Sequence, residues 1–511
     1  MAIELTGIDL LNPQPGTKRE IAFAQGSSGG LTRARDVVIL CNKIASIGSG
    51  SVDGRGDALN TPTAIFNGEA EIIERYGYKS EALLLHKAFT RVNKTAQVWM
   101  LVVPPGSGSA SVDFTFATAA TGATAVIVDF LGEQEQVAVA NADAIATIAT
   151  AVAAKINAKL DWPITASAAL GVVTVTAAVA GSRFDHYLNQ IRMRFTKAAG
   201  TTVTKGGVTA GSTDDDQTTA ISTLENYSIY YQVNPKQITS APTSTDNGIG
   251  EHLASLATQV APTVGKAGVL IAGNTGTVSQ ASAVAVGMNK EFSHLFWAEN
   301  SDWSPGMIAA HMAGIVQSKQ ATNPAANLAG YGSKSADTLY VPDPYAKTDR
   351  ATSAELTTAL NNGVSPIEFS STGKPKLTWL ITTKSQTDSD ADYRARPGHI
   401  PSVMFYAWEI LRNLWNSEAQ PNVANDPADG EQRLAGFTYP GDVKKMVSRM
   451  IDYCIDGGGV PTLLDPSQKQ AMKDSIVVER LTSGVACRVE LSAVRHLLKG
   501  HFKLLETSPS I

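Results

Sequence analysis

The chain has 511 residues, of which 43% are hydrophobic and 17% are charged, and its formal net charge is -5. A single hydrophobic core stops growing well below this length, so we expect about two to four domains. The slight acidic excess, with no block of Lys or Arg, argues against a surface dedicated to nucleic acid.

Residues 1–30 have the composition of an extended N-terminal arm. Proline and glycine interrupt it, Ile21–Phe23 is its one short strand, and its apolar content is too low for it to fold alone. Residues 31–103 are predicted to form the first part of a core. Within that part, Val37–Leu40 and Gln97–Val103 indicate buried strands, and helical spacing lies between them.

Residues 104–212 differ in composition from the segments on either side, because Ala, Thr, Val and Gly dominate them. We interpret 104–212 as an inserted, β-rich outer domain. Its expected order is strands over 112–139, a helix over 142–160 and a strand over 171–178. One face of that helix is apolar because of its residue spacing, and the face consists of Ile145, Ile148, Val152 and Ile156.

A larger α/β pattern resumes over 213–484, the predicted second part of the core. Strands that alternate with helices in units of this length predict a sheet covered by helices. The expected helices are 253–260, 401–418, 442–455 and 467–474, and the expected buried strands are 267–271 and 292–297. Residues 485–511 are expected to form a C-terminal strand, from Cys487 to Leu491, and an arm.

Residues 352–383 contain a helix, a stop and two strands. Leu356 and Leu360 share a helix face, and Asn361–Gly363 is typical of a left-handed helix stop. The period then changes, and short strands are expected over 364–369 and 377–381. This unit carries no side chains typical of an active site.

Cysteine usage and the N-terminal composition indicate the cellular compartment. Cys41, Cys454 and Cys487 lie far apart and form no CxxC pair, so buried thiols are expected instead of a zinc knuckle or a disulfide framework. The N-terminal stretch has no basic or apolar signal region, and no stretch reaches the roughly 18 apolar residues of a membrane span. We expect synthesis in the cytoplasm, no secretion by the usual route and no direct membrane insertion.

Possible catalytic and metal-binding motifs are weak. Gly26–Gly30 matches the letters of a G-x-S-x-G nucleophile elbow around Ser28, but the residues that follow lead into a strand instead of a helix, so a linker is the preferred interpretation. Three alternating aspartates at 388–392 lack the Gly and Glu of a calcium loop and are interpreted as a solvated turn. His294 and His311 have no second ligand at metal spacing.

No catalytic residue, metal ligand or cofactor site is therefore predicted, and we expect a structural protein and not an enzyme. A serine hydrolase that uses Ser28 with His294 or His311 is the alternative from another functional class.

Several segments, taken in their order along the chain, resemble the contractile tail sheath proteins of myophages, specifically the Mu-like branch. The match covers most of the chain, although the N-terminal lead and residues 384–400 differ. The segments that carry it are Pro15–Gly30 before VVILCNK, Tyr76-Gly77 and Val98-Trp99, the helix IATIATAVAAKINA, the NNG at 361–363 with ITT at 381–383, and Val478-Glu479-Arg480 before a β run.

The resemblance implies a multidomain α/β (α+β) fold. Its core would be a mixed sheet with helices, built from both chain halves, with the inserted β-rich domain facing outward and extended arms at both ends. It also implies a virion structural subunit that polymerises as stacked six-fold rings around a tail tube, and whose contraction drives the tube through the host envelope. A phage-tail-like bacteriocin or a secretion system is the alternative machine.

The same resemblance implies partners and contact residues. The partners would be further copies of the chain, the tail tube protein, and the baseplate and tail terminator proteins, with assembly in the host cytoplasm into the virion tail. The arms would pair with neighbouring subunits by β-augmentation, through Ile21, Phe23, Val489, Leu491, Phe502 and Leu504. Lys444, Lys445 and Arg449 are the predicted tube-facing residues, with an ordinary solvated helix face as the alternative.

Overall fold

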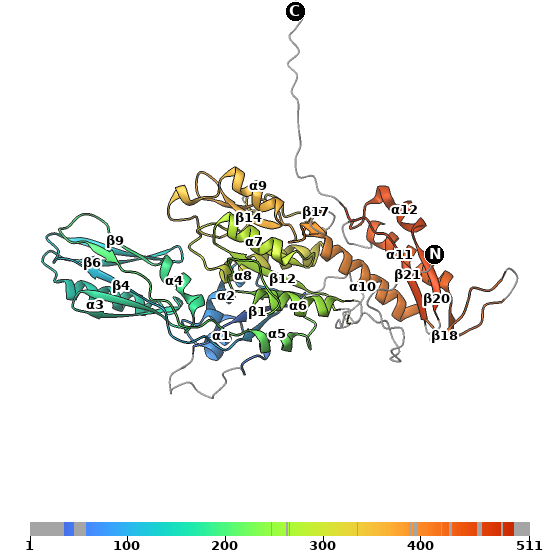
Figure 1. The fold of residues 1–511 in the computed structure, drawn as a ribbon, viewed down its shortest axis with the longest axis horizontal. Helices are drawn as coiled ribbons and strands as arrows, with labels where there is room; N and C mark the ends of the chain where they lie inside the picture. Colours follow the sequence, from blue (N-terminus) through green and yellow to red (C-terminus); the bar gives the residue numbers. More distant parts are fainter. Residues whose placement is uncertain are drawn as a thin grey trace, which may run out of the picture. The chain divides into compact units, whose positions relative to one another are not determined.

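The computed structural model (Figure 1) describes residues 35–44, 58–246, 248–261, 264, 266–334, 336–387, 390–391, 396–420, 422–428, 432–456, 462–481 and 484–494. These residues fall into two compact units. The α/β unit comprises the described residues within 6–322 and 330–401, and the C-terminal unit those within 323–329 and 402–511. Each unit is described by itself.

The α/β unit is organised on an eight-stranded sheet of order β15-β14-β13-β12-β11-β1-β3-β2. In chain order the strands are β1 (Val37–Cys41), β2 (Pro62–Ile65), β3 (Val98–Val102), β11 (Tyr231–Asn234), β12 (Val269–Asn274), β13 (Ser293–Trp297), β14 (Val364–Phe369) and β15 (Pro375–Leu377). The inner strands are parallel, and the two edge strands are antiparallel to their neighbours. The predicted mixed sheet built from both chain halves is confirmed.

Helices cover both faces of this sheet, as Figure 1 shows. One face carries α2 (Glu81–Thr90) and α8 (Pro305–Thr322), and the other carries α5 (Thr218–Leu224), α6 (Ile249–Val260), α7 (Val278–Met288) and α9 (Ser353–Asn361). A further helix, α1 (Glu69–Tyr76), contacts α2. Because both faces are covered, the central strands are buried along their whole length.

Residues 111–205 form two small antiparallel sheets, of order β10-β4-β8-β7 and β6-β5-β9. Their strands are β4 (Ser111–Phe116), β5 (Thr124–Phe130), β6 (Glu133–Val139), β7 (Ile164–Ala169), β8 (Val172–Ala177), β9 (Arg192–Phe195) and β10 (Val203–Lys205). The segment also contains α3 (Ile145–Ala158), the 3-10 turn η1 (Ser182–Phe184) and α4 (Asp185–Gln190). Three residues of the predicted apolar face of α3 are fully buried, namely Ile148, Val152 and Ile156.

The predicted helix stop has the expected local structure. A reciprocal capping box between Thr352 and Glu355 starts α9, the helix ends at Asn361, and Gly363 has a φ of 84° before β14. The prediction of a second strand as far as Ile381 is wrong, because β15 ends at Leu377. At Ile381 the side-chain hydroxyl of Ser365 donates to the backbone oxygen at 3.1 Å and accepts from the backbone N–H at 3.0 Å, which replaces ladder bonding.

The C-terminal unit contains most of α10 (Ile400–Glu418), β18 (Asn422–Val423), β19 (Phe437–Thr438), α11 (Pro440–Asp456), η3 (Pro466–Gln468), α12 (Lys469–Asp474), β20 (Val477–Leu481) and β21 (Gly484–Arg488). The predicted strand from Cys487 to Leu491 is corrected, since β21 begins at Gly484 and ends at Arg488.

The α/β unit also contains three short elements outside the sheets described above. The strands β16 (Gln386–Thr387) and β17 (Asp390–Ala391) pair near the predicted solvated turn, and η2 (Lys347–Asp349) precedes α9. Among the described helices, none combines the length and hydropathy that a membrane span requires.

The stop at Gly363 generates the first prediction. A Cβ at this position would lie 2.7 Å from the backbone oxygen of Thr383, so Gly363→Ala adds a backbone clash to the strain of a positive φ. The strain alone costs about 1–2 kcal/mol. Gly330→Ala is the matched control, because Gly330 has a φ of 71° and its nearest neighbour is the side-chain oxygen of Ser333 at 3.6 Å.

We expect Gly363→Ala to lower the free energy of unfolding in urea by more than Gly330→Ala does. Equal losses in the two variants would mean that the approach of Thr383 does not constrain this turn.

Candidate assembly surface

The exposed face of α11 carries the three side chains predicted to face a tube. Lys444, Lys445 and Arg449 are all exposed, and the opposite face of the helix packs inward through Val443, Met446, Val447, Met450, Ile451 and Cys454. The carboxylate of Glu418 pairs with Arg449 and raises the pKa of its guanidinium. Local positive charge on this face therefore comes mainly from the two lysines.

An open groove of about 630 Å³ lies beside this face. It is lined by Glu418, Phe437, Thr438, Asp442, Lys445, Met446, Ser448 and Arg449. Asp442 is paired with Arg433, so the acidic side of the groove is already partly neutralised. Its lining combines charged, polar and apolar side chains.

The helix α11 also packs against the hairpin β20–β21. Val478 pairs with Cys487 and Glu479 with Ala486, and both strands contact α11. No further strand within the described residues pairs with either edge of this hairpin. Burial raises the pKa of the Cys487 thiol to about 11, so it stays protonated and unreactive at neutral pH.

The chain after β21 folds back on the same unit. Val489 and Leu491 are half-buried, and residues 492–494 run beside 463–465, where the Asp465 N–H donates to the Ser492 oxygen at 2.8 Å. The other predicted arm residues, Ile21, Phe23, Phe502 and Leu504, lie outside the described residues. A role of the six arm residues in subunit contacts stays a prediction.

His294 and His311, the histidines of the hydrolase alternative, form hydrogen bonds with backbone atoms. Nδ1 of His294 donates to the Ile381 oxygen at 2.8 Å, and Nδ1 of His311 donates to the Ala88 oxygen at 2.8 Å. The Tyr340 N–H donates to Nε2 of His311. Burial lowers the pKa of each imidazole to about 4, so both are neutral at pH 7.

Ser28 lies outside the described residues. Within the described ranges, His, Cys, Asp and Glu side chains form no group of three or more that could hold a metal ion.

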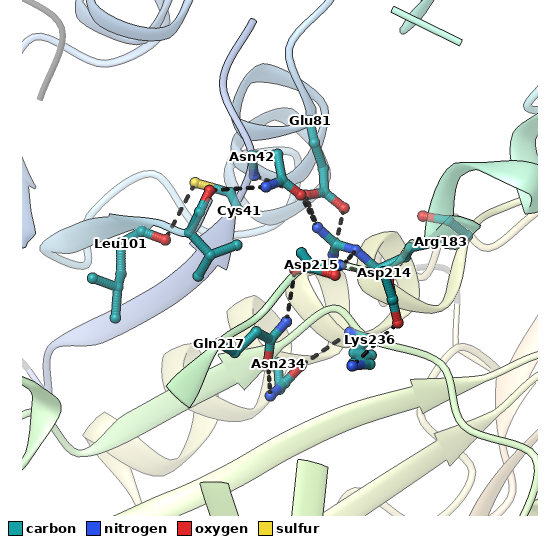
Figure 2. Close-up of polar contacts among 12 residues, drawn as sticks. Cys41, Asn42, Glu81, Leu101, Arg183, Asp214, Asp215, Gln217, Asn234 and Lys236 are labelled. Carbon is teal, nitrogen blue, oxygen red and sulfur yellow. Dashed lines mark hydrogen bonds and ion pairs between the residues drawn. The ribbon is translucent and has the colours of Figure 1, made fainter. Parts of the chain in front are cut away.

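Sequence reasoning missed a buried cluster of charged side chains in the α/β unit, shown in Figure 2. Arg183 of η1 meets Glu81 at the start of α2 and Asp215 ahead of α5. These residues are far apart in sequence and belong to no local motif. Two features of the sequence could have indicated this cluster, namely Arg183 within a segment of few charges and the three consecutive aspartates at 214–216.

The overall structure is similar to those of three known proteins. It aligns with the sheath tail protein of Desulfitobacterium hafniense at a TM-score of 0.46 and 11% identity, covering 93% of this chain and 100% of that one. The sheath tail protein of Listeria innocua aligns at a TM-score of 0.45 and 12% identity, covering 92% and 97%. The helical sheath of the anti-feeding prophage in its contracted state aligns at a TM-score of 0.41 and 9% identity, covering 100% of both.

No known family model matches the sequence, and no curated protein matches it either. A Mu-like branch is not distinguished by these similarities.

The buried His311 generates the second prediction. Its folded pKa, about 4, lies below the value of about 6.5 in an unfolded chain. The unfolded state therefore binds more protons between these values, and stability that is present above pH 6.5 is lost as the pH falls toward 4.

Because His311→Gln removes this titration, the stability advantage of the wild-type protein over the variant should shrink on acidification. We expect it to be smaller at pH 5 than at pH 7.5 by about 2 kcal/mol in urea unfolding. A difference that stays constant over this range would show that His311 is not buried in its neutral form.

Proposed function

We propose that this chain is the subunit of a contractile tail sheath, which works by assembly and cooperative conformational change and not by catalysis. Copies of the chain would stack as six-fold rings around a tail tube, and contraction of the polymer would drive the tube through a target envelope. The ordered sheath-like segments along most of the sequence support this proposal. The anti-feeding prophage protein described above is a helical sheath, and the same role is proposed here.

The single observation that carries the proposal is the open hairpin β20–β21. Within the described part of the chain it is a two-stranded sheet, and α11 packs against both of its strands. The edge strands of a sheet are templates for pairing with another chain through their backbone N–H and C=O groups. A second copy that supplies a strand would satisfy these groups by β-augmentation.

Pairing of this kind is heterologous, because the donor segment and the acceptor hairpin are different parts of the chain. Repeated head-to-tail contacts that do not close generate an open helical polymer, which is the symmetry a sheath needs. The donor segments that we propose are the arm 1–30 and, from the C-terminal strand and arm 485–511, residues 495–511, which follow the acceptor strand β21 and the fold-back beside 463–465. They would remain attached as hinges while the rigid cores rotate and repack during contraction.

The proposed partners are those that the resemblance to sheath proteins implies. They are other copies of the chain, a tail tube protein, and the baseplate and terminator proteins that end the polymer, all within a virion tail assembled in the host cytoplasm. We propose the α11 face with Lys444, Lys445 and Arg449 as the tube contact, because an exposed basic face can attract an acidic partner. A bacteriocin-like particle or a secretion system would use the same subunit, and the presence of a capsid distinguishes them.

The third prediction concerns assembly. The purified full-length chain should form long hollow tubes or stacked rings that are visible by negative-stain electron microscopy as its concentration rises, because each copy both offers and accepts a strand. A uniformly monomeric, compact particle at high concentration would count heavily against a sheath subunit.

The fourth prediction concerns the arms. Deleting residues 1–24 or 495–511 should abolish tube formation and leave the melting temperature of the two units nearly unchanged. The second deletion keeps Val494, whose N–H donates to the Leu463 oxygen at 3.0 Å, so the fold-back beside 463–465 is preserved. Normal tubes from both truncated proteins would refute the exchange of arms.

The hydrolase alternative has a separate test. It requires an esterase activity in the wild-type protein that is lost in Ser28→Ala, while tube formation is expected to be unaffected by this change.

A further inference from the structure

A buried guanidinium group joins the inserted domain, here residues 104–212, to the rest of the α/β unit (Figure 2). Nη1 of Arg183 donates to Oε1 of Glu81 at 2.9 Å, and Nη2 donates to Oε2 at 2.8 Å. Nε lies 3.2 Å from Oδ1 of Asp215, and Nη2 also donates to Oδ1 of Asn42. The side chains of Arg183, Glu81 and Asp215 are 7%, 3% and 1% exposed. Nη1 and Nη2 are therefore hydrogen-bonded inside the protein, whereas Nε has the ion-pair contact with Asp215 but no hydrogen bond.

The guanidinium lies at a distinctive place in the sheet. Asn42 directly follows β1, and Asn234 ends the adjacent parallel strand β11. From this pair the sheet continues through β3 on one side and through β12 on the other, so the strand order reverses here. In open α/β sheets, the crevice beyond the carboxyl ends of the strands at such a reversal is where ligands bind. In this chain Arg183 fills it.

The charges around the crevice favour a cation as its occupant. Three carboxylates, those of Glu81, Asp214 and Asp215, face two cations, Arg183 and Lys236. Without Arg183 the acidic groups would outnumber the basic ones three to one, so a phosphate or other anion would be repelled. A planar cation with N–H donors in a fork matches the paired oxygens of Glu81, and its charge is balanced by the nearby Asp215.

The cost of burying these carboxylates supports the same conclusion. Burial raises the pKa of Glu81 to about 7, although Arg183 and the Asn42 N–H both act to lower it. Burial also raises the pKa of Asp215. A carboxylate left here without a bound cation would be strongly destabilising.

Further polar side chains hold the crevice in shape. The Asn42 N–H donates to Glu81 at 2.9 Å, and Nε2 of Gln217 donates to Asp215 at 3.1 Å. Asn234 in turn donates to Gln217 at 2.7 Å. The acceptor oxygens around Arg183 are thus fixed from β1 and β11 as well as from the helices, so the crevice is preorganised for its occupant.

The loop that carries Arg183 is anchored at the base of the inserted domain. The Gly181 N–H donates to the Gly108 oxygen at 2.9 Å, and the Ser182 N–H donates to the Thr213 oxygen at 3.0 Å, so the loop bonds to both linkers of the domain. A Cβ on Gly106 would lie 2.1 Å from the Thr213 oxygen. This close backbone packing fixes the distance from the linkers to the crevice.

We propose that the crevice at the ends of β1 and β11 is a guanidinium-binding site that the inserted domain occupies with its own Arg183. The inserted domain is thereby docked as an internal ligand and moves with the core as one body. This assignment does not depend on the sheath proposal, since it concerns a contact within one chain.

Other contacts of the inserted domain provide a matched control. Arg192 pairs with Asp302 at 2.8 Å, and the Arg192 side chain is 28% exposed. This pair also links the inserted domain to the core, but Arg192 is more exposed than Arg183, and Asp302 is not among the acceptors of Arg183. Arg192→Ala therefore removes a linking arginine without opening the crevice.

The experiment is chemical rescue of Arg183→Ala in the full chain. Thermal unfolding and the rate of protease cleavage in the linkers near 104–108 and 208–213 are measured with and without millimolar methylguanidinium. Methylammonium at equal concentration controls for charge. We expect the variant to melt lower and to be cleaved several-fold faster than wild type, and methylguanidinium to reverse both changes in a saturable way. Neither salt should help Arg192→Ala.

Failure of methylguanidinium to act on Arg183→Ala, or equal action on both variants, would overturn the proposal. If Arg183→Ala cannot be obtained folded, Arg183→Lys replaces it, because lysine keeps the charge but loses the fork. Linkers as well protected in Arg183→Lys as in wild type would then overturn the requirement for a guanidinium.

Discussion

The parallel pairing of β1 with β11 is the constraint on which the α/β unit depends. Val38 lies opposite Gln232 in this ladder, although the whole inserted domain separates the two strands in sequence. The chain must therefore leave the core and return to it at neighbouring places. The two linkers of the inserted domain run side by side, and the Ser212 N–H donates to the Ser107 oxygen at 2.9 Å. Loop closure over such a long insertion costs entropy that increases only slowly with length, and apolar burial on both sheet faces offsets it.

Buried polar groups contribute to the register of this pairing. Gln232 and Asn234 occupy the centre of the sheet, where Nε2 of His252 donates to Gln232 at 2.7 Å and Asn234 donates to Nδ1 of His252 at 3.2 Å. Burial lowers the pKa of His252 to about 3, which keeps the ring neutral with the proton on Nε2. A slip in register would leave these groups unsatisfied in the core, so the network favours one alignment of β11.

The same polar network explains what sequence could and could not predict. Periodic segments such as α3, α11 and β12 were predictable, because each buries one stripe or one continuous apolar run. The strand β11 was missed because its polar residues are satisfied only by partners distant in sequence. The cluster of Arg183 with Glu81 was missed for the same reason. At the candidate assembly surface, helical spacing placed Lys445 and Arg449 on one face, whereas the ends of β21 depend on pairing with β20, which local pattern does not reveal.

The described residues form an α/β unit that includes the inserted domain, and a C-terminal unit that contains the hairpin β20–β21. We propose that copies of this chain join by adding a strand to this hairpin. The most direct test is a cryo-electron microscopy map of assembled particles that resolves this hairpin. We expect a sheet of more than two strands there, with at least one strand contributed by a neighbouring copy. A sheet that stays two-stranded within an assembled particle would contradict it.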